Sequence, residues 1–142
     1  MLKLLIAVDG SQNALRAVDH LVKNRAWYTA SLEVFLLNVQ VPMTGVNIKL
    51  FVKAEDLNAY YHDEGVAALK DARALLDAAG IHYSHHIGVG DAAKVIVQYV
   101  EAKQCDKIVL GSRGAGVISD LVLGSVATKV ISLAKAPVLL VK

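Results

Sequence analysis

A glycine-rich segment in the last third of the chain contains residue types suited to binding an anion. It reads Gly111-Ser112-Arg113-Gly114 and is followed, after nine residues, by Gly124-Ser125. Glycines let backbone N–H groups approach an anion closely, and a serine at the start of a helix adds a hydroxyl near the positive end of the helix dipole. Arg113 adds a guanidinium that can donate charge-assisted hydrogen bonds. The pattern indicates a phosphate site; the alternative is a structural loop with an ordinary serine N-cap.

Two other phosphate-binding patterns fit less well. The P-loop pattern G-x-x-x-x-G-K-[ST] matches Gly111 and Gly116, but Val117 stands where the lysine must contact phosphate, so this pattern is rejected. The dinucleotide pattern G-x-G-x-x-[GA] matches residues 88–93. It follows a polar, edge-like strand rather than a buried central one, and a plain strand-to-helix turn explains it better.

Candidate catalytic and metal-binding side chains are few. His82 and His86 share one face of an alternating strand but lie ~13 Å apart at ~3.3 Å per residue, too far for one metal ion. Cys105 has no histidine near it in the sequence and is predicted to be an inert thiol. No histidine accompanies Asp9 and Ser11 at a strand end, and a helix cap explains Ser11. We predict no catalytic residue.

Apolar runs and amphipathic stretches alternate regularly along the chain. This alternation predicts a parallel sheet with helices on both faces, because each parallel connection must cross over the sheet through a helix. The predicted strands are Leu4 to Val8, Leu32 to Val39, Ile81 to Val89, Lys107 to Leu110 and Val138 to Val141. Four helices are predicted. The first follows the cap Ser11, and the second runs from Ala54 to Ala79 and stops at Gly80. The third follows the cap Asp91 and ends at Ala102, and the fourth begins near Ser125.

The fold class suggests where a ligand would bind. In open α/β sheets, ligands bind beyond the carboxyl ends of the strands, where the winding direction reverses. The segments that follow the predicted strands are Asp9 to Ser11, Asn38 to Pro42, Gly88 to Gly90 and Gly111 to Gly116. The glycine-rich segment is therefore at the end of the sheet where a ligand is expected.

Composition limits the classes of partner. The 142 residues are 55% hydrophobic and 20% charged, which predicts one ordered domain over residues 1–142. With 15 Lys and Arg against 13 Asp and Glu, the net charge of +2 argues against a nucleic-acid partner. No apolar run reaches the ~18–20 residues of a membrane helix, so no membrane association is expected. The single cysteine and the absence of a recognisable signal sequence favour a cytoplasmic location.

The pattern G-x-x-G-x9-G-S, together with the opening I-A-V-D-G-S (Ile6 to Ser11), resembles the universal stress protein family. The similarity covers the whole chain and includes G-V-G-D-A at residues 88–92 and the ending A-P-V-L-L-V at residues 136–141. In combination these motifs are specific, although each alone is not. The resemblance implies a single-domain, Rossmann-like fold of the adenine-nucleotide alpha-hydrolase type, with an open five-stranded sheet in the order 3-2-1-4-5.

The resemblance also implies a nucleotide site between the first and fourth strands. In the ATP-binding branch of the family the glycine motif holds the phosphates, so the implied ligand is ATP, or ADP or AMP. Asp9 would lie near the phosphates or ribose and could position magnesium, and the backbone of Val39 would meet the adenine. The implied site residues are Ala7, Val8, Asp9, Val39, Gly111, Ser112, Arg113, Gly114, Gly116, Val117, Gly124, Ser125, Val126 and Ala127.

Two residues depart from the family pattern. Asn38 stands where many relatives have histidine, and Ala127 stands where some ATP-binding relatives have threonine or serine. Thr128 is the candidate to replace the hydroxyl missing at position 127.

The predicted function is that of an ATP-binding, cytoplasmic stress-response regulator that is not an efficient enzyme. It has no lysine for a γ-phosphate and no positioned general base, although slow ATP hydrolysis or autophosphorylation is left open. A homodimer through the apolar edge strand Val138 to Val141 is expected from the resemblance and from the need to cover that edge. Two alternatives stay open: an ATP-independent dimeric interaction module with a purely structural glycine loop, and an enzyme that transfers an adenylyl group.

Overall fold

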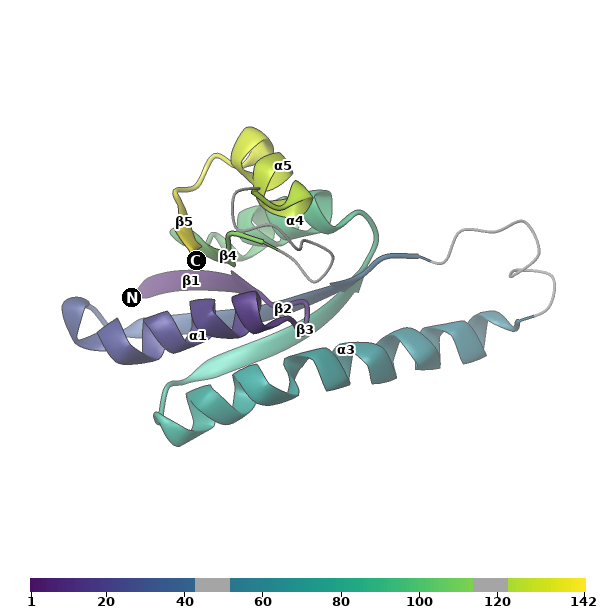
Figure 1. Ribbon diagram of the computed structural model, residues 1–142, viewed down its shortest axis with the longest axis horizontal. Helices are drawn as coiled ribbons and strands as arrows, with labels where there is room; N and C mark the ends of the chain where they lie inside the picture. Colours follow the sequence, from purple (N-terminus) through teal and green to yellow (C-terminus); the bar gives the residue numbers. More distant parts are fainter. Residues whose placement is uncertain (43–51, 114–122) are drawn as a thin grey trace.

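Strand β1 (Leu2–Ala7) lies at the centre of a five-stranded parallel sheet in the order β3-β2-β1-β4-β5. The structure is a computed structural model that describes residues 1–42, 52–113 and 123–142 (Figure 1). The other strands are β2 (Leu32–Gln40), β3 (Tyr83–Val89), β4 (Lys107–Gly111) and β5 (Val138–Val141). The predicted fold class and strand order are confirmed.

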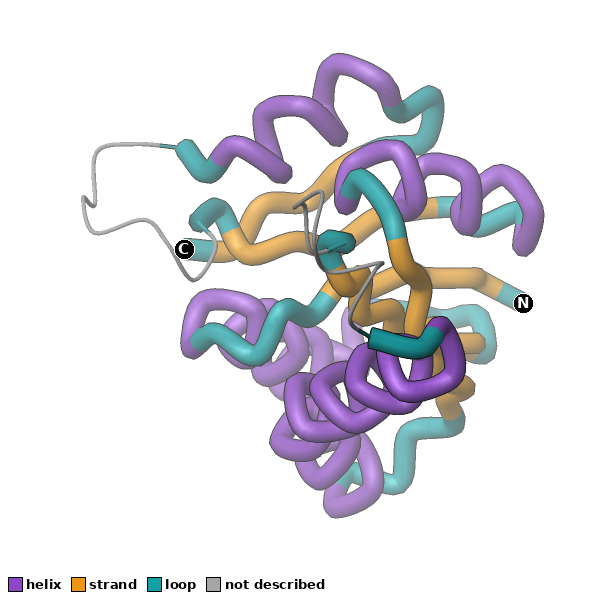
Figure 2. The backbone as a smooth tube through the Cα atoms, turned by 90° about the vertical axis from the view of Figure 1, so that its right-hand side faces the viewer, coloured by secondary structure: helices purple, strands orange, loops and turns teal. Residues whose placement is uncertain are grey.

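The helices cover the two faces of the sheet in sequence order. Helices α1 (Gln12–Asn24) and α3 (Ala54–Ala78) pack on one face, and α4 (Ala92–Lys103) and α5 (Ser125–Leu133) pack on the other (Figures 1 and 2). A single 3-10 turn, η1 (Arg25–Trp27), follows α1. Right-handed crossovers produce this division, because the chain moves from β1 toward β3 and then returns past β1 to β4 and β5.

Alternation along the central strands divides the core into two clusters. On β1, Leu4 and Ile6 face α1 and α3, whereas Leu5 faces α4 and α5, and none of the three is exposed to solvent. On β2, Leu36 and Leu37 are likewise buried on opposite faces. Strands covered on both faces must be apolar throughout, which explains why β1 and β2 appear in the sequence as continuous hydrophobic runs.

The predicted helix signals act as the sequence suggests. Ser11 accepts a hydrogen bond from the backbone N–H of Ala14 at 3.2 Å, which caps α1. The Asp91 carboxylate caps α4 in the same way through the N–H of Lys94, also at 3.2 Å. Gly80 has a φ of +66° and follows the last residues of α3, where a left-handed residue allows the chain to leave the helix.

Several element ends differ from the predictions by one or two residues. β1 begins at Leu2 rather than Leu4, because Leu2 already pairs with Leu32. β3 begins at Tyr83 rather than Ile81, because the N–H of Ile81 bonds the Leu76 carbonyl in the C-terminal turn of α3. Such ends depend on single hydrogen bonds, which hydrophobic periodicity does not register.

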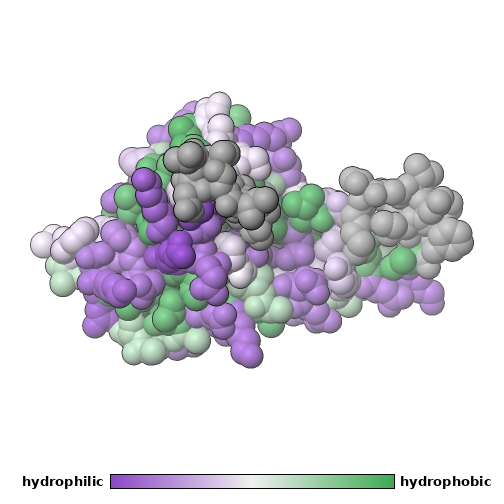
Figure 3. All heavy atoms as spheres, viewed as in Figure 1, coloured by the Kyte–Doolittle hydropathy of each residue, from purple (hydrophilic) through white to green (hydrophobic). Residues whose placement is uncertain are grey.

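The hydropathy of the described helices and of one face of the molecule is mixed. None of the helices in the described ranges is both long and apolar enough to cross a bilayer. On the face shown in Figure 3, hydrophilic and hydrophobic side chains are interspersed.

Helix α3 approaches the edge strand β3 very closely at one glycine. A Cβ atom added to Gly65 would lie 2.5 Å from Cγ2 of Ile87 and 2.8 Å from its Cγ1, both near the Ile87 backbone. A helix interior ordinarily disfavours glycine by about 1 kcal/mol relative to alanine. Gly65 is therefore required by packing and not by local conformation.

We predict that Gly65→Ala lowers the free energy of unfolding by about 1–3 kcal/mol, because overpacking outweighs the gain in helix propensity. Urea denaturation monitored by circular dichroism measures the effect. In an Ile87→Ala background the same substitution should be neutral or stabilising. An equal loss in both backgrounds would show that the contact with Ile87 is not the cause.

Candidate functional site

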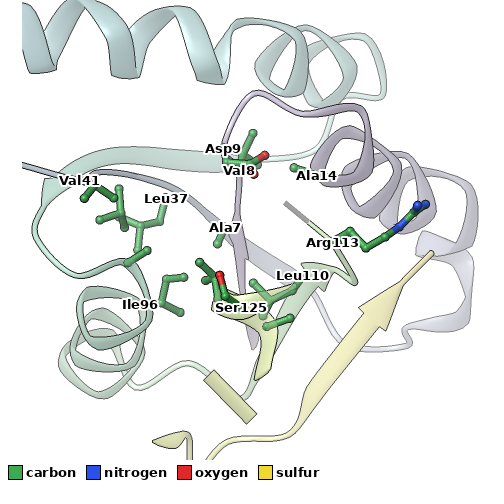
Figure 4. A pocket seen from close by; sticks show the side chains of 15 residues that line it. Ala7, Val8, Asp9, Ala14, Leu37, Val41, Ile96, Leu110, Arg113 and Ser125 are labelled. Carbon is green, nitrogen blue, oxygen red and sulfur yellow. The ribbon is translucent and has the colours of Figure 1, made fainter. Parts of the chain in front are cut away.

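A pocket opens at the carboxyl ends of the central strands, at the point where the winding of the sheet reverses. It has a volume of about 410 Å³, within the range typical of small-molecule sites. Residues from β1, β2, β4, α1, α4 and α5 and from the turns after β1 and β4 surround it (Figure 4). The described lining residues are Ala7, Val8, Asp9, Ala14, Leu37, Val39, Val41, Ala92, Ile96, Leu110, Gly111, Arg113, Ser125, Val126 and Ala127.

The pocket has an apolar side and a polar side. Leu37, Val41 and Ile96 lie together on one side, and Arg113 lies on the opposite side with its guanidinium turned away from Ser125 (Figure 4). That guanidinium lies 3.4 Å from Oδ1 of Asn13 in the first turn of α1. The pocket can therefore enclose a flat apolar group at one end and a polar or anionic group at the other.

The turn after β1 is held in a defined conformation. Oδ1 of Asp9 accepts a hydrogen bond from the backbone N–H of Ser11 at 2.9 Å, while Ser11 itself caps α1. Gly10 has a φ of +87°, a conformation that residues with a Cβ atom rarely adopt, and a Cβ there would be 3.4 Å from Ala68 of α3. These restraints keep Asp9 at the edge of the pocket.

The two halves of the glycine motif meet at the end of β4. The N–H of Gly124 donates to the carbonyl of Ser112 at 2.8 Å, so these two residues of the motif lie side by side. Gly111 allows β4 to end against α1, since a Cβ there would lie 2.9 Å from the carbonyl carbon and oxygen of Asn13. Close approach of backbone to backbone, and not only to a ligand, thus explains this glycine.

Helix α5 is not capped by a serine side chain. Gly124 is its N-cap residue and Ser125 is its first residue, so the alternative that Ser125 is an ordinary N-cap in a structural loop is wrong. The first backbone N–H groups of α5 consequently have no capping side chain at Gly124. The hydroxyl of Thr128 donates to the Gly124 carbonyl at 2.9 Å, so its proton is used within the helix and does not replace a hydroxyl at position 127.

Comparison with known proteins identifies the fold family. The model of the universal stress protein family matches residues 1–142. The chain belongs to this family. Universal stress protein MJ0531 of Methanocaldococcus jannaschii is 31% identical over 140 residues, which cover 99% of this chain and 81% of that protein. Universal stress protein YxiE of Bacillus subtilis is 27% identical, with 99% of this chain and 98% of that protein covered.

Solved structures of similar proteins include nucleotide complexes. The hypothetical protein MJ0577 superposes with a TM-score of 0.81 at 28% identity, covering 99% of this chain and 94% of that one. A universal stress protein in complex with cAMP has a TM-score of 0.67 at 25% identity, covering 99% and 96% of the two chains. An Arabidopsis thaliana family member with AMP bound shares the fold at 23% identity and a TM-score of 0.70, covering 100% and 92%. Some universal stress proteins thus bind adenine nucleotides.

Most of the site residues expected for a universal stress protein lie together in this structure. The pocket lining includes nine of the described expected residues: Ala7, Val8, Asp9, Val39, Gly111, Arg113, Ser125, Val126 and Ala127. Ser112 and Gly124 are not in the lining but bond one another beside it. Gly114, Gly116 and Val117 lie outside the described residues.

The apolar side of the pocket was not predicted. Leu37 precedes the expected Val39 by two residues on β2, and Val41 follows it by two, just after the strand ends. The period of two along a strand could have identified them. Ala92 and Ile96 are four residues apart on α4, which puts them on one helix face. Nothing local in the sequence shows that this helix face lies opposite β2.

An ion pair connects the two helices that border the pocket. The ammonium of Lys129 on α5 lies 3.0 and 3.1 Å from the two carboxylate oxygens of Asp91, the cap of α4. The hydrogen bonds from Lys129, and then that from the N–H of Lys94, lower the pKa of Asp91 from its ordinary value. Because the folded pKa is lowered, the pair stabilises the protein above the ordinary range of aspartate and loses that effect as the pH falls through the folded pKa.

The buried thiol of Cys105 is unsuited to nucleophilic chemistry. It precedes β4 at the end of the sheet opposite the pocket, and burial raises its pKa to about 11. The thiolate is the reactive form, so this cysteine is inert at neutral pH, as predicted.

We expect Lys129→Met to lower the melting temperature modestly at neutral pH, since half-exposed ion pairs contribute little each. The difference from the parent should shrink as the pH falls from the ordinary range of aspartate through the lowered pKa of Asp91, where the carboxylate becomes protonated. Scanning calorimetry from neutral pH down to below the lowered pKa of Asp91 measures it, with Lys70→Met on the opposite face as the matched control. A difference that stays constant over this range would rule out the Asp91 pair as its origin.

Proposed function

We propose that this universal stress protein is a regulatory protein that binds an adenine nucleotide, ATP or its products ADP and AMP, in the pocket at the reversal of the sheet. One observation carries the proposal: the apolar side of the pocket, between β2 and α4, leads to Asp9 in the turn after β1 and to the start of α5. An adenine ring, a ribose and a phosphate chain have this same sequence of chemistry.

The adenine occupies the apolar side in this proposal. Leu37, Val39 and Ile96 contact the ring faces, and backbone groups at the end of β2 meet its polar edge, since the lining on this side contains no polar side chain among the described residues. Bound cAMP and AMP in other universal stress proteins support an adenine ligand. The small side chain of Ala7 leaves room for the ring.

The ribose and phosphates occupy the polar side. The Asp9 carboxylate accepts hydrogen bonds from ribose hydroxyls, and the phosphates lie against the start of α5, where Ser125 adds a hydroxyl. Gly114, Gly116 and Val117 complete the phosphate contacts in this proposal on the strength of the motif alone. Among the described residues no group of three or more His, Cys, Asp or Glu could hold a metal ion, so magnesium would be held by Asp9 together with phosphate oxygens.

The role that follows is binding rather than efficient catalysis. In the described part of the lining the ionisable side chains are Asp9 and Arg113. An arginine cannot act as a general base, and in this proposal the Asp9 carboxylate accepts from the Ser11 N–H and from the ribose rather than from an attacking water. A nucleotide regulates such a protein by favouring one state of its loops or partner surface over another. We place this protein in the cytoplasm, where adenine nucleotides are plentiful and Cys105 stays reduced.

Titration calorimetry should detect saturable binding of ATP, ADP or AMP with and without magnesium, and mass spectrometry should find the nucleotide in the purified protein. Asp9→Asn should weaken binding about tenfold, since a charge-assisted hydrogen bond to ribose becomes a neutral one. Asp63→Asn on the exposed surface of α3 is the control. If no nucleotide co-purifies and calorimetry shows no heat of binding, the protein is an ATP-independent interaction module. If mass spectrometry instead finds AMP attached to an acceptor protein that was incubated with ATP, the protein is an adenylyl transferase.

We also propose that the protein is a homodimer through the outer edge of β5, with which no other strand in the described part of the chain pairs. The N–H groups of Ile108 and Ser112 donate to the carbonyls of Pro137 and Val141. The backbone N–H and C=O groups of odd-numbered residues in β5 therefore point toward β4, and those of even-numbered residues point away from the sheet. All four β5 residues are half-buried within the single chain. An apolar edge with unpaired backbone groups is a template for a second copy.

Leu140→Pro should therefore convert a dimer into a monomer, because it removes an outward N–H without breaking the ladder to β4. Leu139→Pro, which removes an inward N–H, should instead destabilise the fold. Sedimentation velocity distinguishes these results. A Leu140→Pro variant that sediments like the parent dimer would exclude the β5 edge.

A further inference from the structure

Asn38 is an amide in an otherwise apolar environment. In the described part of the chain it is the one amide or charged side chain that is buried, with 2% of its surface exposed. It shares its face of β2 with Val34 and Leu36, both fully buried, on the side of the sheet that α1 and α3 cover. Burying an amide is unfavourable unless both of its ends are hydrogen-bonded, so its presence requires an explanation.

Both ends of the amide are bonded, and in a fixed orientation. Nδ2 of Asn38 donates to the backbone carbonyl of Val8 at 2.8 Å. Its Oδ1 accepts from Nε2 of Gln40 at 2.7 Å, which leaves the amino group to face Val8. The carbonyl of Gln40 in turn accepts from the N–H of Gly90 at 3.0 Å. These bonds connect the ends of β1 and β2 with the turn after β3.

The bond to Val8 lies at the place where β1 leaves the sheet. The N–H of Val8 donates to the Leu37 carbonyl at 2.8 Å, and the carbonyl of Val8 is held by Asn38. Because a peptide unit is planar, holding that carbonyl also fixes the N–H and Cα of Asp9. Asp9 lies in the pocket lining, whereas Asn38 does not.

We propose that Asn38 is a positioning residue for the nucleotide site: its side-chain amide holds the carboxyl end of β1 so that Asp9 is already in place before the ligand binds. This inference rests on the proposed nucleotide function for its effect on affinity. Without the amide, the Val8 carbonyl loses its buried donor, and the turn from Asp9 to Ser11 samples other conformations. The apparent affinity for the ligand then falls in proportion to the fraction of molecules that still have Asp9 in place.

The test measures ATP affinity by titration calorimetry in a double-mutant cycle between Asn38→Leu and Asp9→Asn. Asn38→Leu should weaken binding about tenfold in the parent and less than about twofold in the Asp9→Asn background, because the effect of Asn38 acts through Asp9. Leu36→Val, which destabilises the same face of β2 but leaves the hydrogen bond from Asn38 to Val8 in place, should leave affinity unchanged. Gln40→Met removes only the bond that orients the amide and should have a smaller effect, of about two- to threefold, again coupled to Asp9.

Amide hydrogen exchange by NMR gives a readout that needs no ligand. The N–H of Ser11 is bonded to the Asp9 carboxylate, so its exchange reports directly on the turn. Asn38→Leu should raise Ser11 exchange at least about tenfold while the amides of β2 at Leu36 and Leu37 stay protected. Leu36→Val should leave Ser11 unchanged.

Each outcome decides the inference. Equal affinity losses in both Asp9 backgrounds, unchanged affinity, or unchanged Ser11 exchange would overturn it. If the parent protein binds no adenine nucleotide, the proposed function fails and with it the role of Asn38 in binding, whereas the exchange data still decide whether Asn38 holds the turn. If Asn38→Leu does not fold, the Gln40→Met measurements decide the same questions.

Discussion

The reversal of winding at β1 is the constraint on which the other features depend. β1 pairs in parallel with β2 on one side and with β4 on the other. Right-handed crossovers then put α1 and α3 on one face and α4 and α5 on the other, so the connections after β1 and β4 leave the sheet in opposite directions. The space between those connections is the pocket. Its lining draws on six elements far apart in the sequence because this one reversal brings their ends together.

The pocket offers a ligand mainly its shape and its backbone groups. The net charge of the chain is only +2, and the described pocket lining contains a single carboxylate and a single guanidinium. Backbone N–H groups at a helix start carry partial positive charge that a count of ionisable residues does not include. A protein of nearly neutral charge can therefore still bind a phosphate, provided that its turns are held in the correct conformation.

Hydrogen bonds from residues outside the pocket hold those turns. Ser11 and Asp91 cap the helices that follow two of them, and the Gly124 N–H bonds the Ser112 carbonyl across the glycine motif. Lys129 connects α5 to the cap of α4, and Asn38 connects β2 to the end of β1. A site whose groups are ordered in advance loses less conformational entropy when it binds. The layer behind the pocket is thus as much a part of the site as the residues that line it.

The sequence by itself determined the features that depend on neighbouring residues. Apolar runs, helix periodicity, the caps Ser11 and Asp91 and the stop at Gly80 are local signals, and the segment motifs were specific enough to indicate the family and its strand order. Only the tertiary structure decided what depends on contacts between distant residues: the apolar wall of Leu37, Val41 and Ile96, the packing of Gly65 on Ile87 and of Gly111 on α1, and the bond from Asn38 to Val8. From the sequence, Asn38 was only a departure from a family pattern. Its role depends on a carbonyl thirty residues earlier, and pairing at that distance is set by strand register and not by any local preference.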